Sequence, residues 1–386
     1  MIQVIIIIIS LILSLGTHQI EWGFYGHKKI NRLAVFTLPE DMLGFYKSNI
    51  EYLAEHAIDP DKRRYAILNE ATRHYIDIDH WDTIPFENVP RDFGDAILKY
   101  GSFHLLRELS DTIDLKLDHF VDKEFIKEAV LDDRYSEEIF FGFDTIQNQL
   151  THIDLTGSFS KLLFKNELAA NGTLPFFLEE FYKRLVYAFE NRNSRAILKI
   201  SADIGHYIAD AHVPLHTSLN YNGQLTNQIG IHAFWESRLP ELFAEEEYDF
   251  LVGKANYIKE MRPYIWNIII ESHALLADVL DNEKYLKSIF PEDQQFCFDE
   301  RSNISIRTQC PEFAEAYHKS LNGMVEKRMQ ESILAVGSIW YSAWVDGGQP
   351  DLDELKSAVA IIENESNDAP SKKMIKRNKK QRIHNN

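Results

Sequence analysis

The chain has 386 residues, 45% hydrophobic and 12% aromatic, which excludes an intrinsically disordered protein and allows one large domain or two smaller ones. Its net charge is −18, and because residues 371–386 carry seven Lys and Arg and no acid, the remainder lies near −25. Such an acidic body excludes attachment to a long nucleic acid by counterion release alone, so a bound phosphate ester would need local arginines or cations.

The N-terminus carries an apolar run, VIIIIISLILSL, from Val4 to Leu15. This run is shorter than the roughly 20 residues of a membrane-spanning helix and is typical of a secretory signal peptide, although no Lys or Arg precedes it. Ser14 and Gly16 offer a small-residue cleavage site. We therefore predict a signal peptide within residues 1–21, cut after 16 or after 21, and a secreted or periplasmic protein; an uncleaved anchor is the alternative.

Most of the chain shows the spacing of apolar residues, three and four apart, that is typical of helices. The clearest examples are Ile197–Ile208, Tyr257–Leu280, Phe313–Met324 and Ile333–Trp344. The last pattern stops at DGGQP, where glycine and proline end helices. Because strictly alternating patterns are scarce, we predict an all-α multi-helix domain from about Trp22 to about Ile362.

Segment 82–171 has a less regular pattern. It contains short helical patterns such as AILKYGSFHLLREL, and we predict a helical insertion packed on the main bundle. Residues 363–386 are expected to form a disordered, solvated basic tail, and no obligate protein partner is predicted. Cys297 and Cys310 would pair in an exported chain and stay free thiols in a reducing compartment.

The stretch GHYIADAHVPLH gathers several metal-binding side chains. His206 and Asp210 are four residues apart and share one helix face, and Pro214 ends that helix, so His216 falls in the following turn. The motif HAFWE repeats the spacing with His232 and Glu236. Imidazole and carboxylate are good zinc ligands, so we predict a metal site; solvated histidines or a single salt bridge are the alternatives.

The spacing alone carries little weight. Fifteen histidines and 59 acids predict about 2.3 His-x3-acid pairs by chance, and the chain has three. The third pair, His104 and Glu108, lies in an apolar segment, and we interpret His104 as a helix-surface or half-buried histidine without a catalytic role. The other two pairs stand out because they fall together with His216 within a short stretch.

Two further motifs complete the pattern: WGFYGH at Trp22–His27, and the segment from Asp59 through Arg63 to RHYIDID, which contains His74. Together the four motifs resemble, in order, those of the superfamily of zinc-dependent phospholipases C and S1/P1 nucleases. The resemblance spans Trp22 to Glu236 and extends to the long terminal helix. It implies an all-α phosphoesterase with three zinc ions.

The resemblance also implies a ligand set. One zinc would be bound by Asp59, His74, His206 and Asp210, a second by His216, His232 and Glu236, and a third by His27, Asp210 and the free amine and carbonyl of Trp22. Asp59 would contact the bridging water, and Arg63 or Arg64 would bind the phosphate, unless these arginines are only solvated.

The chain departs from the family pattern in several ways. Cleavage after Gly16 would leave residues 17–21 before Trp22, block its amine and leave two zinc ions instead of three. Asp61 stands in the family's D-x-x-R relation to Arg64 and competes with Asp59 as the ligand. The gap from His74 to His206 is longer than in the fungal nucleases, which also have more cysteines.

The implied reaction is hydrolysis of a phosphoric ester by a water that two zinc ions share. The short spacing from Trp22 to His27 and the HYID motif favour a nuclease or nucleotidase-like phosphodiesterase acting on single-stranded nucleic acid or nucleotides. In such an enzyme Tyr75 would stack on a base and Asp77 would accept from it; Tyr75 as core packing is the alternative. Glu236 and the short gap from His216 to His232 favour a phospholipase C-like enzyme. A zinc-binding module without catalysis is the third possibility.

Overall fold

The computed structural model describes residues 23–355, apart from 68, 108–111, 157 and 302–303. The predicted signal peptide, Trp22 and the basic tail therefore lie outside the described residues. The described chain is mainly helical but contains two small antiparallel sheets, so the prediction of a purely all-α protein is corrected. None of its described helices combines the length and the apolar character needed to cross a membrane.

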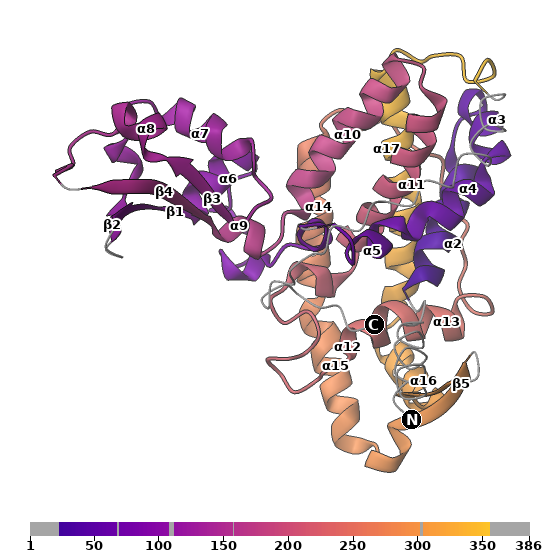
Figure 1. Cartoon of the computed structure of the whole chain (residues 1–386). Coiled ribbons are helices and arrows are strands. Elements are labelled where there is room, and N and C mark those ends of the chain that lie inside the picture. Colours follow the sequence, from indigo (N-terminus) through magenta and orange to yellow (C-terminus); the bar gives the residue numbers. More distant parts are fainter. Residues whose placement is uncertain (1–22, 68, 108–111, 157, 302–303, 356–386) are drawn as a thin grey trace, which may run out of the picture.

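The bundle is the larger part of the structure (Figure 1). Its helices are α2 (Phe24–Ala34), α3 (Glu40–Ser48), α4 (Ile50–Glu55), α5 (Asp59–Arg63), α10 (Leu174–Glu190), α11 (Ser194–Ala211), α12 (Ile231–Ala233), α13 (Leu239–Phe243), α14 (Met261–Ala274), α15 (Leu276–Ile289), α16 (Pro311–Ser320) and α17 (Met324–Asp346). The predicted long helix at Tyr257–Leu280 is two helices, α14 and α15, which Leu275 separates. Helix α17 ends before Gly347, as predicted.

Helix α11 is the central helix of the bundle. It packs against α2, α10 and α17, and all of its residues from Ser201 to Ala211 are buried. At Gly205 a Cβ atom would lie 2.0 Å from Asn31 Oδ1, so glycine is required for the close approach of α2. The Asn31 amide donates to Ala202 O at 3.0 Å and holds the two helices together. This contact brings the first turn of α2 beside the C-terminal half of α11.

The insertion contains a four-stranded sheet as well as helices, so the prediction of a helical insertion is corrected. Its elements are α6 (Phe93–Tyr100), β1 (Gly101–Arg107), β2 (Thr112–Leu115), α7 (Lys123–Leu131), β3 (Glu138–Gly142), α8 (Phe143–Ile146), β4 (Phe159–Asn166) and α9 (Glu167–Ala170). The strands are antiparallel in the order β2-β1-β4-β3. Phe103 and Leu105 alternate into the core while His104 lies on the other face, so the segment predicted to be helical has the two-residue period of a strand.

The insertion projects to one side of the bundle in Figure 1 and packs on α10. Phe93 stacks on Phe176 with ring centroids 4.9 Å apart, and Tyr135 donates a hydrogen bond of 2.6 Å to Glu180. Phe176 and Glu180 are both on α10, the helix that directly precedes α11 in the chain. The insertion is therefore attached to the scaffold of the bundle through a mixed apolar and polar contact.

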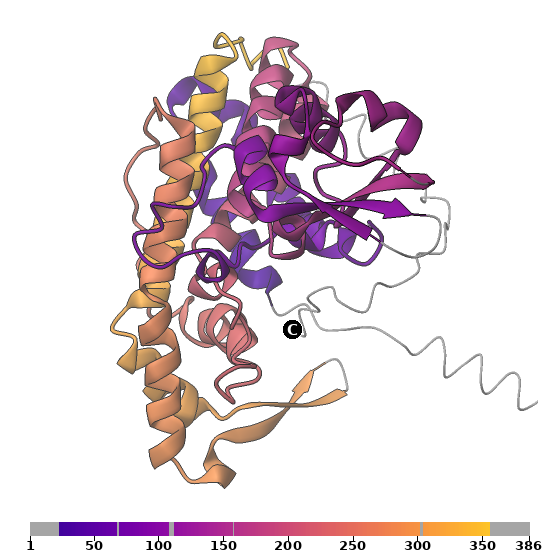
Figure 2. The ribbon, with the colours of Figure 1, turned by 90° about the vertical axis from the view of Figure 1, so that its left-hand side faces the viewer.

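A disulfide-linked hairpin lies near the end of the bundle that holds α15 and α16 (Figures 1 and 2). It consists of β5 (Phe296–Arg301) and β6 (Ile304–Gln309). Cys297 and Cys310 form a disulfide, which resolves the alternative that the sequence left open. Arg238 contacts Asp299 of the hairpin at 2.7 Å, which fixes the hairpin to the segment carrying Glu236.

Candidate metal centre

The C-terminal half of α11 carries the first pair of candidate ligands. His206 and Asp210 are one turn apart and buried, with His206 Nε2 3.3 Å from Asp210 Oδ2. The helix ends at Ala211, and a short turn at Pro214–Thr217 follows, as the proline predicted. This turn brings His216 Nδ1 to 3.8 Å from Asp210 Oδ1. The two oxygens of Asp210 therefore face different histidines.

A first donor group contains Asp61, His74 and His206, with Asp210 beside them. His74 Nδ1 lies 2.9 Å from Asp210 Oδ2 and 3.0 Å from His206 Nε2. Asp61 Oδ1 is 3.9 Å from His74 Nδ1 and 3.8 Å from His206 Nε2. Helix α5, the segment after it and α11 thus contribute to one compact, buried set of nitrogen and oxygen atoms.

A second donor group contains His216, His232 and Glu236. The Nε2 atoms of the two histidines are 2.8 Å apart, and Glu236 Oε2 lies 3.3 Å from His216 Nε2 and 2.8 Å from His232 Nε2. His232 is on α12, and Glu236 is on the π-helical turn Phe234–Arg238 that continues it. Such π turns are frequent at functional sites because they redirect a side chain within a helix.

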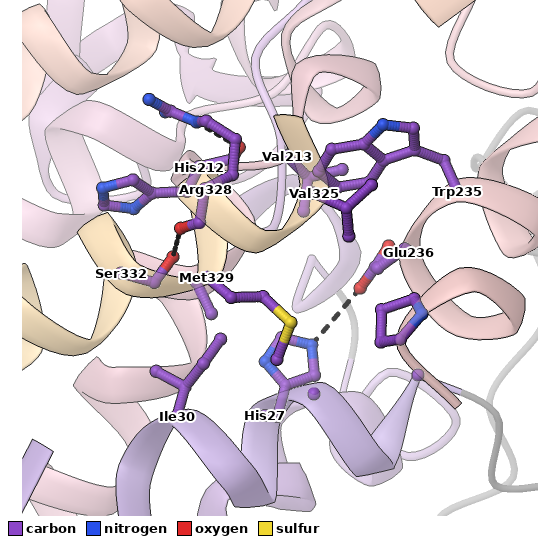
Figure 3. Close-up of a pocket in the computed structure, with 14 residues that line it drawn as sticks. His27, Ile30, His212, Val213, Trp235, Glu236, Val325, Arg328, Met329 and Ser332 are labelled. Carbon is purple, nitrogen blue, oxygen red and sulfur yellow. Dashed lines mark hydrogen bonds and ion pairs between the residues drawn. The ribbon is translucent and has the colours of Figure 1, made fainter. Parts of the chain in front are cut away.

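A third donor group contains His27 with His206 and Asp210. His27 Nε2 lies 3.6 Å from Asp210 Oδ1 and 3.4 Å from Glu236 Oε1, the contact drawn in Figure 3. These distances are long for direct hydrogen bonds but suit groups that share a cation. Trp22, the other expected member of this group, lies outside the described residues.

The three groups fit a divalent cation of the zinc type. Tetrahedral ligands about 2.0–2.1 Å from zinc lie about 3.3 Å from one another, and the contacts above scatter around that value. His27 is 4% exposed, and its Nδ1 has no hydrogen-bond partner among the described residues. His216 Nδ1 donates to His74 O at 2.6 Å, which directs the lone pair of Nε2 toward the second group.

The buried side chains of the candidate centre have strongly shifted pKa values. Burial opposes ionisation of Asp210, but His206 and His216 outweigh it and hold the pKa of Asp210 well below its usual range. Burial likewise opposes charge on His206, yet Asp210 and Asp61 raise its pKa to about 9. For His74, burial dominates and lowers the pKa to about 4. The carboxylates of Asp61 and Asp210 thus favour a positive charge at this place in the fold.

Asp59, the preferred aspartate in the sequence-based ligand set, is not part of these groups. Its carboxylate is 32% exposed and contacts His56 at 2.6 Å and Lys62 at 3.4 Å. Asp61 is on the opposite side of α5, since two residues turn a helix by about 200°. The structure therefore places Asp61, and not Asp59, beside the candidate histidines, and the D-x-x-R relation of Asp61 to Arg64 is the feature of the sequence that points to it.

Arg63 was the other expected catalytic residue, and it contacts acidic side chains of the scaffold. Its guanidinium lies 3.3 Å from Glu70 and 3.1 Å from Asp203. Arg64 is the arginine beside the centre, with its guanidinium 2.9 Å from Asp61 Oδ1. The structure thus pairs Arg63 with Glu70 and Asp203 of the scaffold and pairs Arg64 with Asp61, so Arg64 is the arginine that lies next to a candidate ligand.

Tyr75 and Asp77, the expected base-binding residues, are both 2% exposed. The Tyr75 hydroxyl donates to Ala170 O at 3.4 Å, and its backbone carbonyl packs against Gly172. The backbone of Asp77 is held beside the end of the insertion, since its N–H donates to Asn171 O at 2.8 Å. The burial of the Tyr75 ring favours the alternative of core packing, and the contacts of Tyr75 and Asp77 with a base stay predictions.

His104 lies apart from the donor groups, on β1 of the insertion. Its Nδ1 is 2.7 Å from Asp114 Oδ1 on the neighbouring strand, and its Nε2 is 2.8 Å from Ser102 Oγ. The sequence-based interpretation of a half-buried histidine without a ligand role agrees with this position, although the element is a strand and not a helix.

A small apolar cavity borders the third donor group (Figure 3). Its volume is about 40 Å³, enough for a few water molecules. His27 and Glu236 form its polar edge, and the rest is largely aliphatic and aromatic, including Ile30, Trp235 and Met329. The apolar wall lowers the local dielectric around these two side chains and strengthens their interaction with any cation.

No protein-family model matches the chain, and no curated protein matches it either. The chemical interpretation of the centre therefore depends on its geometry and on the order of the motifs.

Proposed function

We propose that the protein is a zinc-dependent phosphoric ester hydrolase, of the kind found among S1/P1 nucleases and phospholipases C. The observation that carries the proposal is the convergence of three donor groups on the single buried carboxylate of Asp210. A structural metal site needs one such group. Three adjoining groups are typical of centres in which metal ions act together on a substrate.

Each side chain has a part in this proposal. Asp61, His74, His206 and Asp210 would hold one ion, His216, His232 and Glu236 a second, and His27 with Asp210 and the Trp22 amine a third. When bound, the ions would lower the pKa of a coordinated water and polarise the phosphoryl oxygen. Asp210 orients both sides of the centre because its two oxygens face different donors. Arg64 neutralises part of the charge on Asp61 and fixes its orientation.

The substrate class within phosphate esters is a separate question. The sequence motifs favour a nuclease or nucleotidase-like enzyme, but Tyr75 and Asp77, the residues expected to bind a base, are buried. The support for a nucleic acid is therefore reduced to motif spacing. A phospholipase C-like activity stays as the second candidate, and an observation near the second donor group favours it, as argued below. Export to the periplasm or the exterior remains part of the proposal.

The experiment combines metal analysis with turnover of bis-p-nitrophenyl phosphate by the purified protein. We expect two or three zinc ions per chain and hydrolysis that a chelator abolishes and added zinc restores. Stoichiometric zinc without chelator-sensitive hydrolysis of this or any other phosphodiester would instead identify a zinc-binding module. An absence of bound zinc after dialysis against micromolar zinc would reject the proposal entirely.

A further inference from the structure

The segment Ser218–Gly230, here called the rim loop, leaves the metal centre and returns to it. It begins two residues after His216 and ends two residues before His232, whose Nε2 atoms are 2.8 Å apart. Tyr221 meets the His232 ring edge-on, with centroids 6.1 Å apart. In Figure 1 this part of the chain lies before α12 and beside α15. Anything that the rim loop binds is therefore held next to the second donor group.

The rim loop buries amide side chains while it exposes aliphatic ones. Three of its five amides, Asn220, Asn222 and Gln228, are 2–8% exposed, and the other two, Gln224 and Asn227, are exposed; Leu225 and Ile229 are 66% and 65% exposed and Leu219 is 41% exposed. In soluble proteins the amides are usually outside and the aliphatic side chains inside. An exposed leucine alone is ordinary, but buried amides beneath three exposed aliphatic side chains need an explanation.

The buried amides make the loop rigid. Asn220 Oδ1 accepts from Leu225 N at 2.8 Å, Asn222 Oδ1 accepts from Gly230 N at 3.0 Å, and Gln228 donates to Leu280 O of α15 at 2.7 Å. Asp79 accepts from Leu219 N at 3.0 Å and anchors the start of the loop. The aliphatic side chains are thus presented on a fixed backbone, and insertion into a partner would cost little ordering entropy.

Gly223 shows that the loop shape depends on its sequence. Its φ is +71°, and a Cβ atom there would lie 2.4 Å from the carbonyl oxygen of Gln228. Its N–H donates to Asn220 O, and its carbonyl accepts from Gln228 N at 2.9 Å. A side chain at this position would break the turn that precedes the exposed Leu225.

The chemistry of the exposed side chains selects the partner. No residue of the rim loop is charged, although 26% of the whole chain is, and the net charge of −18 repels an anionic surface. Single-stranded nucleic acid would need aromatic platforms and positive charge, but the loop has no cation, its aromatic residue Tyr221 packs against His232, and its most exposed apolar side chains are aliphatic. Aliphatic side chains that stand on an uncharged, rigid loop suit the boundary between the headgroups and acyl chains of a neutral bilayer.

We propose that the rim loop docks the protein on the surface of zwitterionic phospholipids, with Leu219, Leu225 and Ile229 inserted between the headgroups. Docking in this way places the second donor group at the headgroup level, where a phosphodiester bond of the lipid lies. This choice of substrate rests on the proposed hydrolase function, but the docking itself does not require turnover.

The test measures sedimentation of the zinc-loaded protein with phosphatidylcholine vesicles. We expect binding by the unmodified chain and a loss of at least tenfold in partitioning for the double variant Leu225→Ser/Ile229→Ser. The matched control, Val121→Ser/Leu251→Ser, removes two aliphatic side chains that are 66% and 90% exposed elsewhere, and it should bind like the unmodified protein. Unchanged binding by the loop variant, or an equal loss in the control, would refute the docking surface.

A second measurement does not depend on a loss of binding. Trp fluorescence of Leu225→Trp should shift to shorter wavelength on addition of the vesicles, whereas that of Leu251→Trp should not. Tighter binding to phosphatidylglycerol vesicles, loss of oligonucleotide binding in the loop variant, or a dimer that the loop variant dissociates would each assign the loop to another partner and overturn the proposal.

The two proposals fail separately in this design. Hydrolysis of soluble bis-p-nitrophenyl phosphate without vesicle binding would leave the hydrolase and remove the docking surface. Vesicle binding without hydrolysis of any phosphodiester would leave the docking surface and remove the hydrolase. The loop variant should retain the zinc content and the soluble activity of the unmodified chain, which shows that its metal centre is intact.

Discussion

Asp61 and Arg64 form a largely buried ion pair at the edge of the candidate metal centre, with Oδ1 and Nη2 2.9 Å apart. Burial opposes the charge of Asp61, but Arg64, followed by His206 and His74, keeps the pKa of its carboxyl below the usual value. The carboxylate is therefore ionised at neutral pH and directed at the two histidines. A carboxylate that is ionised, largely shielded from solvent and directed at two histidines is suited to bind a metal ion.

The first prediction follows from this pair. Asp61→Asn should weaken one zinc site and lower kcat/KM for a phosphodiester by roughly 100-fold, because a direct ligand should cost at least as much as a residue that supports a ligand. Zinc content by mass spectrometry and steady-state kinetics measure both effects. Asp59→Asn is the matched control on the same helix and should leave both unchanged. Loss of zinc and activity in Asp59→Asn, with both unchanged in Asp61→Asn, would identify Asp59 as the ligand.

Arg63 should matter for stability more than for catalysis. Arg63→Gln leaves Glu70, which is fully buried, and Asp203 with fewer counter-charges. Breaking a buried pair costs several kcal/mol, and because the Arg63 side chain is 25% exposed we expect about 2 kcal/mol. Urea unfolding should show this loss, while KM for the phosphodiester stays within about twofold. A large rise in KM with unchanged stability would return Arg63 to the substrate.

Asp210 should be the most sensitive single position for metal binding. Its Oδ2 lies 2.9 Å from His74 and its Oδ1 3.8 Å from His216, so Asp210→Asn disturbs more than one donor group. We expect loss of more zinc than from any other single substitution, and loss of activity with it. His104→Ala, on β1, should keep full zinc content and activity. Unchanged zinc in Asp210→Asn would exclude its bridging role.

The mature N-terminus should decide the number of ions. A protein that starts at Trp22 offers a free amine one residue before Gly23, which borders the cavity beside His27. We expect three zinc ions for this form and two for a form that retains residues 17–21. Preparing both forms and measuring their zinc content tests this, and N-terminal sequencing of the exported protein shows which form is natural. Equal stoichiometry would remove the amine from the ligand set.

The parts of the site that the sequence predicted are those set by helical period. His206 and Asp210 lie on one face of α11, and Pro214 ends the helix before His216, because these relations depend on neighbouring residues alone. The choice between Asp59 and Asp61 could not be made in this way. Both lie in the short helix α5, and only packing against α11 decides which side of it faces the histidines.

The insertion shows the same limit for the fold. In SFHLLREL apolar residues occur at both helical and strand spacing, and pairing of Leu105 with Leu162 across β1 and β4 decides in favour of a strand. The burial of Tyr75 likewise depends on distant chain, since the turn at Ala170–Gly172 after the insertion covers it. Long-range contacts of this kind leave no periodic signal in a single sequence.

The last prediction concerns pH. In the metal-free protein the pKa of His206 is raised to about 9 and that of His216 is also raised, in both cases by nearby carboxylates that outweigh burial. Their stabilising charge is fully present below the unfolded pKa of about 6.5 and is lost as the pH rises toward 9. The melting temperature of the metal-free chain should therefore fall from pH 6.5 to pH 9.

Zinc binding should depend on pH for the same reason. Because zinc must displace the proton of His206, binding at pH 7 should release protons, and the calorimetric enthalpy should then depend on the buffer. The affinity for zinc should rise toward pH 9. A melting temperature that rises over this interval, or binding enthalpies independent of buffer, would show that His206 is neutral before the metal arrives.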